Sequence, residues 1–220
     1  MIKIKNIYIS TFTIAFFFIC KFFGALEYVF ISYVSLSLHE MFHLLYAVKI
    51  KITVKRIVIL PFGINIKISE KLTTENEVFL CASGPLGSGL ILCIFLYLKY
   101  KGISFFYIDY IILSNASIFF INIIPVYPLD GGRIMRCILE SKIGYYKAVN
   151  MSVWISEVFA CIICFFVFLS VLFSKCNLSI MVLCCFLIYS LIKEKTQAVV
   201  SFAQLLLYSK EKLKNLKNFR

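Results

Sequence analysis

Residues 27–48 read EYVFISYVSLSLHEMFHLLYAV, a stretch long and apolar enough to cross a bilayer, and it carries both histidines of the chain. His39 and His43 are four residues apart, so on a helix their imidazoles lie on one face and can bind a single metal ion. Glu40 follows the first histidine, where its carboxylate can reach a water beside that ion. In this H-E-x-x-H arrangement the histidines bind zinc and the glutamate acts as general base. The stretch therefore predicts a zinc site within a membrane helix.

The composition is that of an integral membrane protein. Of the 220 residues, 61% are hydrophobic, and the mean hydropathy is +0.93, whereas about 45–50% of a soluble domain is apolar. We expect an all-α membrane protein with six transmembrane helices, a small β-hairpin between the second and the third, and a single domain over residues 1–192. The expected spans are 6–23, 27–48, 78–98, 103–124, 148–173 and 177–192.

The positive charges predict the orientation. If both termini are cytoplasmic, 19 of the 23 lysines and arginines lie on cytoplasmic segments, as the positive-inside rule requires. Residues 193–220 form a basic tail, which we expect to lie as an amphipathic helix on anionic lipid. The alternative is that this tail docks an acidic partner. Nucleic-acid binding is not expected from so short a segment beside a bilayer.

The nine cysteines do not predict disulfides, because most of them lie in apolar spans, where a free cysteine behaves as a small hydrophobic residue. Cys161 and Cys164 form a C-x-x-C pattern inside an uninterrupted apolar stretch. We interpret this pair as packing residues and not as a metal or redox site.

A hydrolytic zinc site needs a third protein ligand, and the chain offers two aspartates. Asp109 lies near the non-cytoplasmic end of the fourth expected span and is interpreted as interfacial. Asp130 lies at the other end of that span, in the segment 122–132, NIIPVYPLDGG. The prolines of this segment end a helix, and its glycines, Gly131 and Gly132, allow a close backbone approach to a metal. The alternative is a simple turn in which Asp130 caps a helix that begins near Gly131.

The pairing of H-E-x-x-H with N-x-x-P-x-x-x-L-D-G in a later span resembles the site-2 proteases, which are intramembrane zinc metalloproteases, and the resemblance covers nearly the whole chain. It implies a Zn²⁺ cofactor and assigns these roles: zinc ligands His39, His43 and Asp130; catalytic acid and base Glu40; site-shaping residues Asn122, Pro128 and Gly131. Asn122 is expected to contact the substrate backbone.

Residues 82–87, ASGPLG, resemble the small-residue break that this family has in its third span. The alternative is that these small residues serve close helix packing. Phe42 and residues 128–133 resemble the compact sporulation branch of the family, which lacks a PDZ domain and processes a sigma-factor precursor. That branch often ends in CBS repeats, which the residues after Lys193 are too few to form, so nucleotide control is not expected.

The loop 49–77 contains two segments rich in β-branched residues, 52–60 and 63–68, with a turn at 61–63. They predict a hairpin. Its unpaired edge can hold an extended substrate by β-augmentation. The alternative is a hairpin that only lies on the membrane surface.

These features together predict a zinc-dependent intramembrane endopeptidase that cleaves a membrane-associated protein near the cytoplasmic face, with a sporulation sigma-factor precursor as the expected substrate. A membrane inhibitor or regulator is an expected partner. Within the same class, the alternatives are cleavage of an anti-sigma factor or of signal-peptide remnants. A different class is a membrane zinc transporter, which would need ligands spread along a pathway. A third is an inactive relative, against which the presence of Glu40 speaks.

Overall fold

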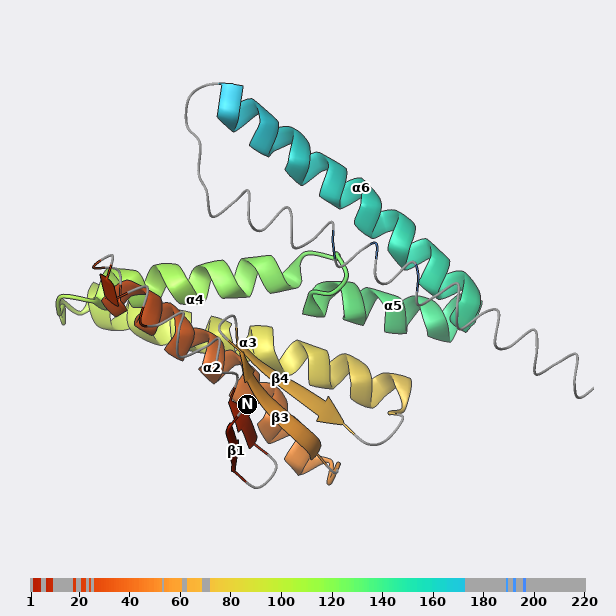
Figure 1. Ribbon diagram of the computed structural model, residues 1–220, viewed down its shortest axis with the longest axis horizontal. Helices are drawn as coiled ribbons and strands as arrows, with labels where there is room; N and C mark the ends of the chain where they lie inside the picture. Colours follow the sequence, from red (N-terminus) through yellow and green to blue (C-terminus); the bar gives the residue numbers. More distant parts are fainter. Residues whose placement is uncertain are drawn as a thin grey trace, which may run out of the picture. The chain divides into compact units, whose positions relative to one another are not determined.

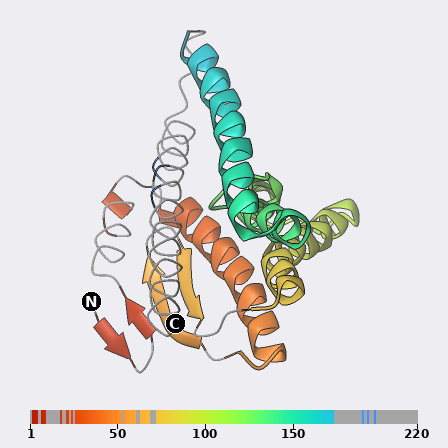
Figure 2. The ribbon, with the colours of Figure 1, turned by 90° about the vertical axis from the view of Figure 1, so that its right-hand side faces the viewer.

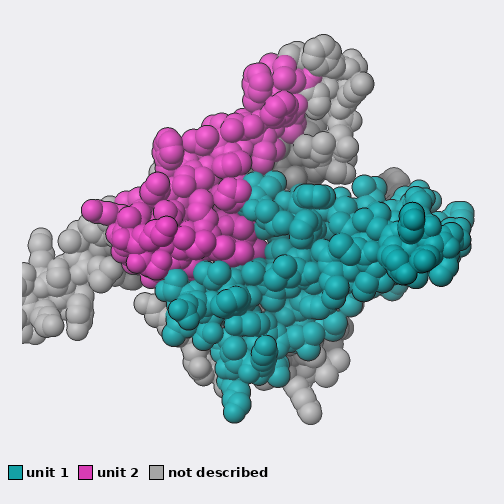
Figure 3. Space-filling view, turned by 180° about the vertical axis from the view of Figure 1, so that it is seen from behind, with its two compact units in different colours: residues 1–124 teal, residues 125–220 magenta. Residues whose placement is uncertain are grey.

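The computed structural model describes residues 2–4, 7–9, 26–52, 54–60, 63–68 and 72–172, with isolated residues at 18, 21, 22, 24, 189, 192 and 196. These residues belong to two compact units, which Figure 3 colours separately: residues 1–124 and residues 125–220. Each unit is described by itself. Nearly all of the expected tail, 193–220, and of the expected sixth span, 177–192, lies outside the described residues.

Three helices form the body of the first unit, and each packs against the other two (Figure 1). They are α2 (Leu26–Lys49), α3 (Thr74–Tyr100) and α4 (Ile108–Ile123). Helix α3 begins after Thr73, whose hydroxyl accepts a hydrogen bond from the backbone N–H of Asn76. Helix α3 is long because its sequence is apolar over many consecutive residues. In apolar surroundings a chain favours a helix, since every backbone polar group is then satisfied within the helix.

Polar contacts fix how α2 faces α4. The side-chain Nδ2 of Asn115 donates to the Ser35 hydroxyl at 3.1 Å, and Asn115 is only 1% exposed. Nearer the start of both helices, the hydroxyls of Ser32 and Ser114 are 3.2 Å apart. In apolar surroundings such hydrogen bonds hold helices together and set their rotation. Since Ser35 lies one helical turn before His39, this contact also orients the face that carries the histidines.

A four-stranded sheet with strand order β1-β2-β3-β4 accompanies these helices. Its strands are β1 (Ile2–Ile4), β2 (Ile7–Ile9), β3 (Val54–Leu60) and β4 (Gly63–Ile68). The pair β3–β4 is antiparallel, with Leu60 opposite Gly63, and β4 runs beside α2, as Figure 2 shows. The pair β2–β3 is parallel and the pair β1–β2 is antiparallel.

The strand β2 corrects the start of the first expected span. We expected a membrane helix from residue 6, but Ile7–Ile9 pairs with Ile57–Ile59 as strand. Isoleucine is common both in apolar helices and in strands, so a short apolar run does not distinguish the two. Most of the rest of residues 6–23 lies outside the described residues.

The second unit contains two described helices that pack against each other, α5 (Asp130–Ile143) and α6 (Tyr145–Leu172). Gly144 separates them and has a φ of 79°, a left-handed conformation that glycine adopts without a Cβ clash. Before α5, the backbone N–H of Tyr127 donates to the hydroxyl of Ser156 on α6 at 3.0 Å. The turn that leads into α5 is therefore fastened to α6.

Two described helical segments are long and apolar enough to cross a membrane, Thr74–Tyr100 and Lys147–Leu169, and Ile108–Ile123 is a shorter apolar helix. They correspond to the expected spans 78–98, 148–173 and 103–124. Helix α2 has 24 residues but is not among them. The described part of the chain is thus mostly helical, with two apolar helices of membrane-spanning length.

Candidate metal centre

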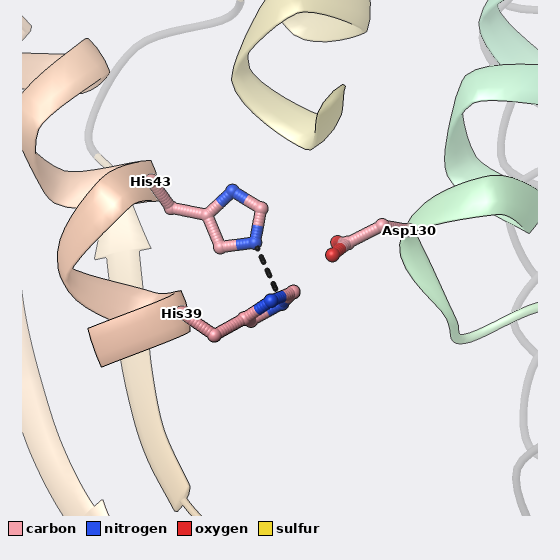
Figure 4. A group of neighbouring side chains, drawn as sticks. All are labelled: His39, His43 and Asp130. Carbon is pink, nitrogen blue, oxygen red and sulfur yellow. Dashed lines mark hydrogen bonds between the residues drawn. The ribbon is translucent and has the colours of Figure 1, made fainter. Parts of the chain in front are cut away.

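Helix α2 places the imidazoles of His39 and His43 on one face, as their spacing predicts. The two Nε2 atoms are 3.3 Å apart, and the ring planes are nearly perpendicular, at 87°. The dashed line in Figure 4 marks this contact. His39 is buried, with 2% of its surface exposed, and His43 is partly buried. Both Nε2 atoms therefore point to a common position where one ion could bind.

The other nitrogen of each ring has its own partner on α3. The Nδ1 of His43 lies 2.6 Å from the backbone carbonyl oxygen of Leu80, and the Nδ1 of His39 lies 3.0 Å from the hydroxyl of Ser88. A carbonyl only accepts, so the Nδ1 of His43 carries the hydrogen and its Nε2 presents a lone pair. Partners of this kind orient the histidine ligands of metal sites. The histidine pair is thus arranged for binding through both Nε2 atoms.

Gly84 lets the backbone of α3 approach these ligands. A Cβ atom added at Gly84 would lie 2.2 Å from Nε2 of His43 and 2.8 Å from Cε1 of His39. One turn on, a Cβ at Gly87 would lie 2.0 Å from the ring of Phe42. The expected break at residues 82–87 is wrong, because α3 runs through them without interruption despite Pro85. The alternative, close packing through small residues, is what the structure has.

The contributions of Leu80 and Ser88 were not predicted from the sequence. Leu80 contributes a backbone oxygen, which no residue type can signal. The contact of Ser88 could have been predicted, because Ser88 is a hydroxyl residue in an apolar helix. It lies four residues after Gly84 and hence on the same face of that helix. A buried hydroxyl requires a hydrogen-bond partner, and for Ser88 that partner is His39.

Asp130 is the first residue of α5 and is 7% exposed. The residue that caps this helix is Leu129, which makes no side-chain capping bond, so the alternative interpretation of Asp130 as the cap is wrong. A carboxylate in the first turn still interacts favourably with the helix dipole. At Gly132 the backbone comes close to the turn before α5: a Cβ there would lie 2.4 Å from the backbone N of Tyr127.

The remaining expected site residues lie as follows. Glu40 is on α2 and is partly buried. Asn122 is in the last turn of α4, and its Nδ2 donates to the carbonyl oxygen of Ile118 at 3.0 Å. Pro128 lies in the turn before α5, after a cis peptide bond from Tyr127. Their roles in the site remain predictions. Asp109, the aspartate not assigned to the site, pairs with Lys99.

His39 and His43 of the first unit and Asp130 of the second are side chains of the kind that could hold a metal ion (Figure 4). Two nitrogens bound to tetrahedral zinc at about 2.0–2.1 Å stand roughly 3.3–3.4 Å apart. The observed 3.3 Å between the Nε2 atoms matches that separation. Two imidazoles and one carboxylate are also the ligand types of hydrolytic zinc sites. The residues therefore fit zinc.

Comparisons with known proteins agree with this chemistry. Residues 98–166 match Peptidase family M50. A zinc metalloprotease of Methanocaldococcus jannaschii is 34% identical over 144 residues, which are 63% of this chain and 42% of that protein. Stage IV sporulation protein FB of Bacillus subtilis is 27% identical over 164 residues, 73% of this chain and 56% of that protein. The chain thus spans about half the length of these curated relatives.

A solved structure also resembles this one. The site-2 protease from Methanocaldococcus jannaschii superposes with a TM-score of 0.66 at 26% sequence identity. The match covers 88% of this chain and 93% of that one.

Proposed function

We propose that this chain is a zinc-dependent intramembrane endopeptidase of the site-2 protease type, which the match of residues 98–166 to peptidase family M50 and the similarity to the site-2 protease structure support. The observation that carries this proposal is the histidine pair, whose Nε2 atoms are 3.3 Å apart while each Nδ1 faces a partner on α3. His39, His43 and Asp130 are the proposed ligands, and their ligand chemistry, two imidazoles and one carboxylate, supports that assignment.

In this proposal His39, His43 and Asp130 would hold a zinc ion, which when bound would supply polarisation of the scissile carbonyl and a lowered pKa of the attacking water. Glu40 takes a proton from that water and later delivers it to the leaving amine. Its position beside His39 on a partly buried turn of α2 supports this role. Asn122, Pro128 and Gly131 shape the site, and Asn122 at the end of α4 can turn its amide toward the backbone of a substrate.

The proposed substrate is a membrane-associated protein cut near the cytoplasmic face, and the sporulation resemblance makes a sigma-factor precursor the first to test. The match to a stage IV sporulation protein supports that choice. An anti-sigma factor and signal-peptide remnants are the alternatives, and a membrane regulator is a proposed partner. Strand β4 pairs with β3 on one side and ends the sheet order, so its other edge is where an extended substrate would add.

We further propose six membrane spans over a single domain of residues 1–192, with both termini and the basic tail 193–220 on the cytoplasmic side of a bacterial membrane. The distribution of lysine and arginine supports this orientation. Helices α3 and α6, which are long and apolar enough to span a bilayer, support the third and fifth spans.

A zinc transporter is the alternative from another class, and it would need several ligand groups along a path. The two histidines of the chain lie one turn apart on α2, so the chain offers no further histidine for a path. A single histidine pair favours a catalytic site over a pathway.

The proposal is tested by co-expressing the full chain with tagged candidate precursors and comparing it with Glu40→Gln. The variant removes the proposed base and keeps all three ligands, so it should retain zinc in metal analysis while cleavage falls at least about 100-fold. Wild-type cleavage in Glu40→Gln would exclude Glu40 as the base. Absence of zinc from the purified wild-type chain would contradict the proposed function as a whole.

A further inference from the structure

Helices α5 and α6 form a helical hairpin. Gly144 alone joins them, and the two helices pack against each other (Figure 1). Just before α5 begins, the backbone N–H of Tyr127 donates to the hydroxyl of Ser156, which lies about three turns into α6. Because the start of α5 is thus fastened far along α6, α5 runs back beside α6. Residues 142–147, where α5 ends and α6 begins, are the tip of this hairpin.

The tip exposes cationic and apolar side chains together. Lys142 and Lys147 are exposed, and so are Ile143, with 38% of its surface, and Tyr145, with 47%. A Cβ atom added at Gly144 would meet nothing within 4 Å, so the bend between the helices is open. Within the described part of the chain, neither lysine forms an ion pair. The tip is therefore a cationic surface whose charge the hairpin does not itself neutralise.

The tip also lies where an apolar segment of membrane-spanning length begins. That segment of α6 is Lys147–Leu169. Tyrosine is enriched where a span meets water, and a lysine at this level keeps its ammonium group in water while its stem covers apolar surface. Trp154 is 64% exposed and lies about 14 Å further along α6 than Tyr145. The exposed side chains of this hairpin thus change from an interfacial type at the tip to an apolar type deeper in α6.

We propose that the tip of this hairpin binds anionic phospholipid headgroups, with Lys142 and Lys147 at the phosphates and Tyr145 at the level of the headgroups. The positive charge matches an anionic lipid, and the apolar side chain of Ile143 beside it matches the acyl chains just below the headgroup. Each lysine near an anionic bilayer surface contributes about a 5-fold preference. The inference rests on the membrane spans of the proposed function and does not involve the metal centre.

The experiment measures the depth of the tip by tryptophan fluorescence, because the chain has one tryptophan, Trp154. The full chain is reconstituted into phosphatidylcholine vesicles that contain lipid with a nitroxide on carbon 5 or on carbon 12 of an acyl chain. In the wild type, Trp154 should be quenched more by the deep carbon-12 label. With Tyr145→Trp in a Trp154→Phe background, the tryptophan should be quenched more by the shallow carbon-5 label.

The preference for anionic lipid is measured with the same Tyr145→Trp chain. Carbon-5-labelled phosphatidylglycerol should associate with the tip at least about 5-fold more strongly than phosphatidylcholine with the same label. Adding Lys142→Gln and Lys147→Gln should remove most of this preference. The matched control is Lys101→Gln, because Lys101 is an exposed lysine beside the ring of Tyr97 in the first unit. This control should leave the preference unchanged.

Native mass spectrometry provides a second measurement that keeps the natural aromatic residues in place. After incubation with equal amounts of the two lipids, the wild-type chain should retain more phosphatidylglycerol than phosphatidylcholine. The chain with Lys142→Gln and Lys147→Gln should retain the two lipids about equally. Both lysines are exposed, so this variant leaves the packing of α5 against α6 intact.

The inference is overturned if lipid labels quench Trp154 of the wild type but not the tryptophan of the Tyr145→Trp chain, since water or a protein would then cover the tip. Equal association of the two lipids, or a preference that survives the loss of both lysines, also overturns it. Failure of the proposed spans gives a different result, because Trp154 of the wild type would then not be quenched by either lipid label.

Discussion

At the scale of single residues, Gly84 sets how closely α3 can approach both histidines. Substitution by alanine would put a Cβ atom 2.2 Å from Nε2 and 2.4 Å from Cε1 of His43. The imidazole cannot simply turn away, because the Leu80 carbonyl holds its Nδ1 at 2.6 Å. Either the ring or the helix must move, and overpacking of this kind costs about 1–3 kcal/mol.

We therefore expect Gly84→Ala to lose at least about 10-fold in zinc affinity, as seen when the support of a ligand is disturbed. Metal analysis after dialysis against a graded zinc buffer measures this. The control is Leu86→Ala on the same helix, since Leu86 is 68% exposed. If Gly84→Ala bound zinc as tightly as Leu86→Ala, the close packing at Gly84 would have no bearing on the metal.

The two aspartates of the chain provide a second comparison at this scale. Asp130→Ala removes the proposed third ligand and should lower zinc retention by about 10-fold or more. Asp109→Ala removes a carboxylate that is paired with Lys99 and largely exposed, so its effect on zinc should be negligible. Zinc content measured on both purified variants decides the point. Full zinc retention in Asp130→Ala would show that another group is the third ligand.

At the scale of elements, the turn before α5 depends on hydrogen bonds from α6. The fully buried hydroxyl of Ser156 accepts from the N–H of Tyr127 at 3.0 Å and donates to the carbonyl oxygen of Ser152 at 2.8 Å. This turn leads directly into Asp130, the first residue of α5. A buried N–H that loses its acceptor costs about 1–3 kcal/mol.

Ser156→Ala should therefore lower the stability of the protein by about 1–3 kcal/mol. Thermal unfolding in detergent, followed by tryptophan fluorescence, measures the change. Ser141→Ala is the matched control, because the Ser141 hydroxyl donates to the Ile138 carbonyl on an exposed face of α5. Equal stability of the two variants would mean that the Ser156 contact with the turn contributes nothing.

At the scale of the whole molecule, an ion bound to the folded chain stabilises it against unfolding. Zinc at 100 times its dissociation constant should add about 2.7 kcal/mol, so the unfolding temperature of the wild type should rise when zinc is added. His43→Ala removes one ligand and should abolish this response. An equal rise in both proteins would mean that zinc stabilises through other groups.

The sequence alone determined the features that depend on local spacing. Four-residue spacing on one helix put His39 and His43 together, because the period of a helix is fixed by its backbone. Long apolar runs indicated α3 and α6, since only a helix satisfies its own backbone groups over such a length. Prolines and glycines after Asn122 indicated the turn before Asp130, and one of the two interpretations included a helix that begins near Gly131.

The tertiary structure decided what depends on contacts between distant segments. The partners of the histidines, Leu80 and Ser88, lie on another helix, and packing rather than spacing brings them to Nδ1. The parallel pairing of Ile7–Ile9 with Ile57–Ile59 joins segments fifty residues apart, so no local pattern could reveal it. Local preferences act between neighbouring residues, whereas the orientation of the ligands depends on which surfaces pack against each other. Apolar surfaces that face protein and apolar surfaces that face lipid have the same composition, so the sequence does not distinguish them.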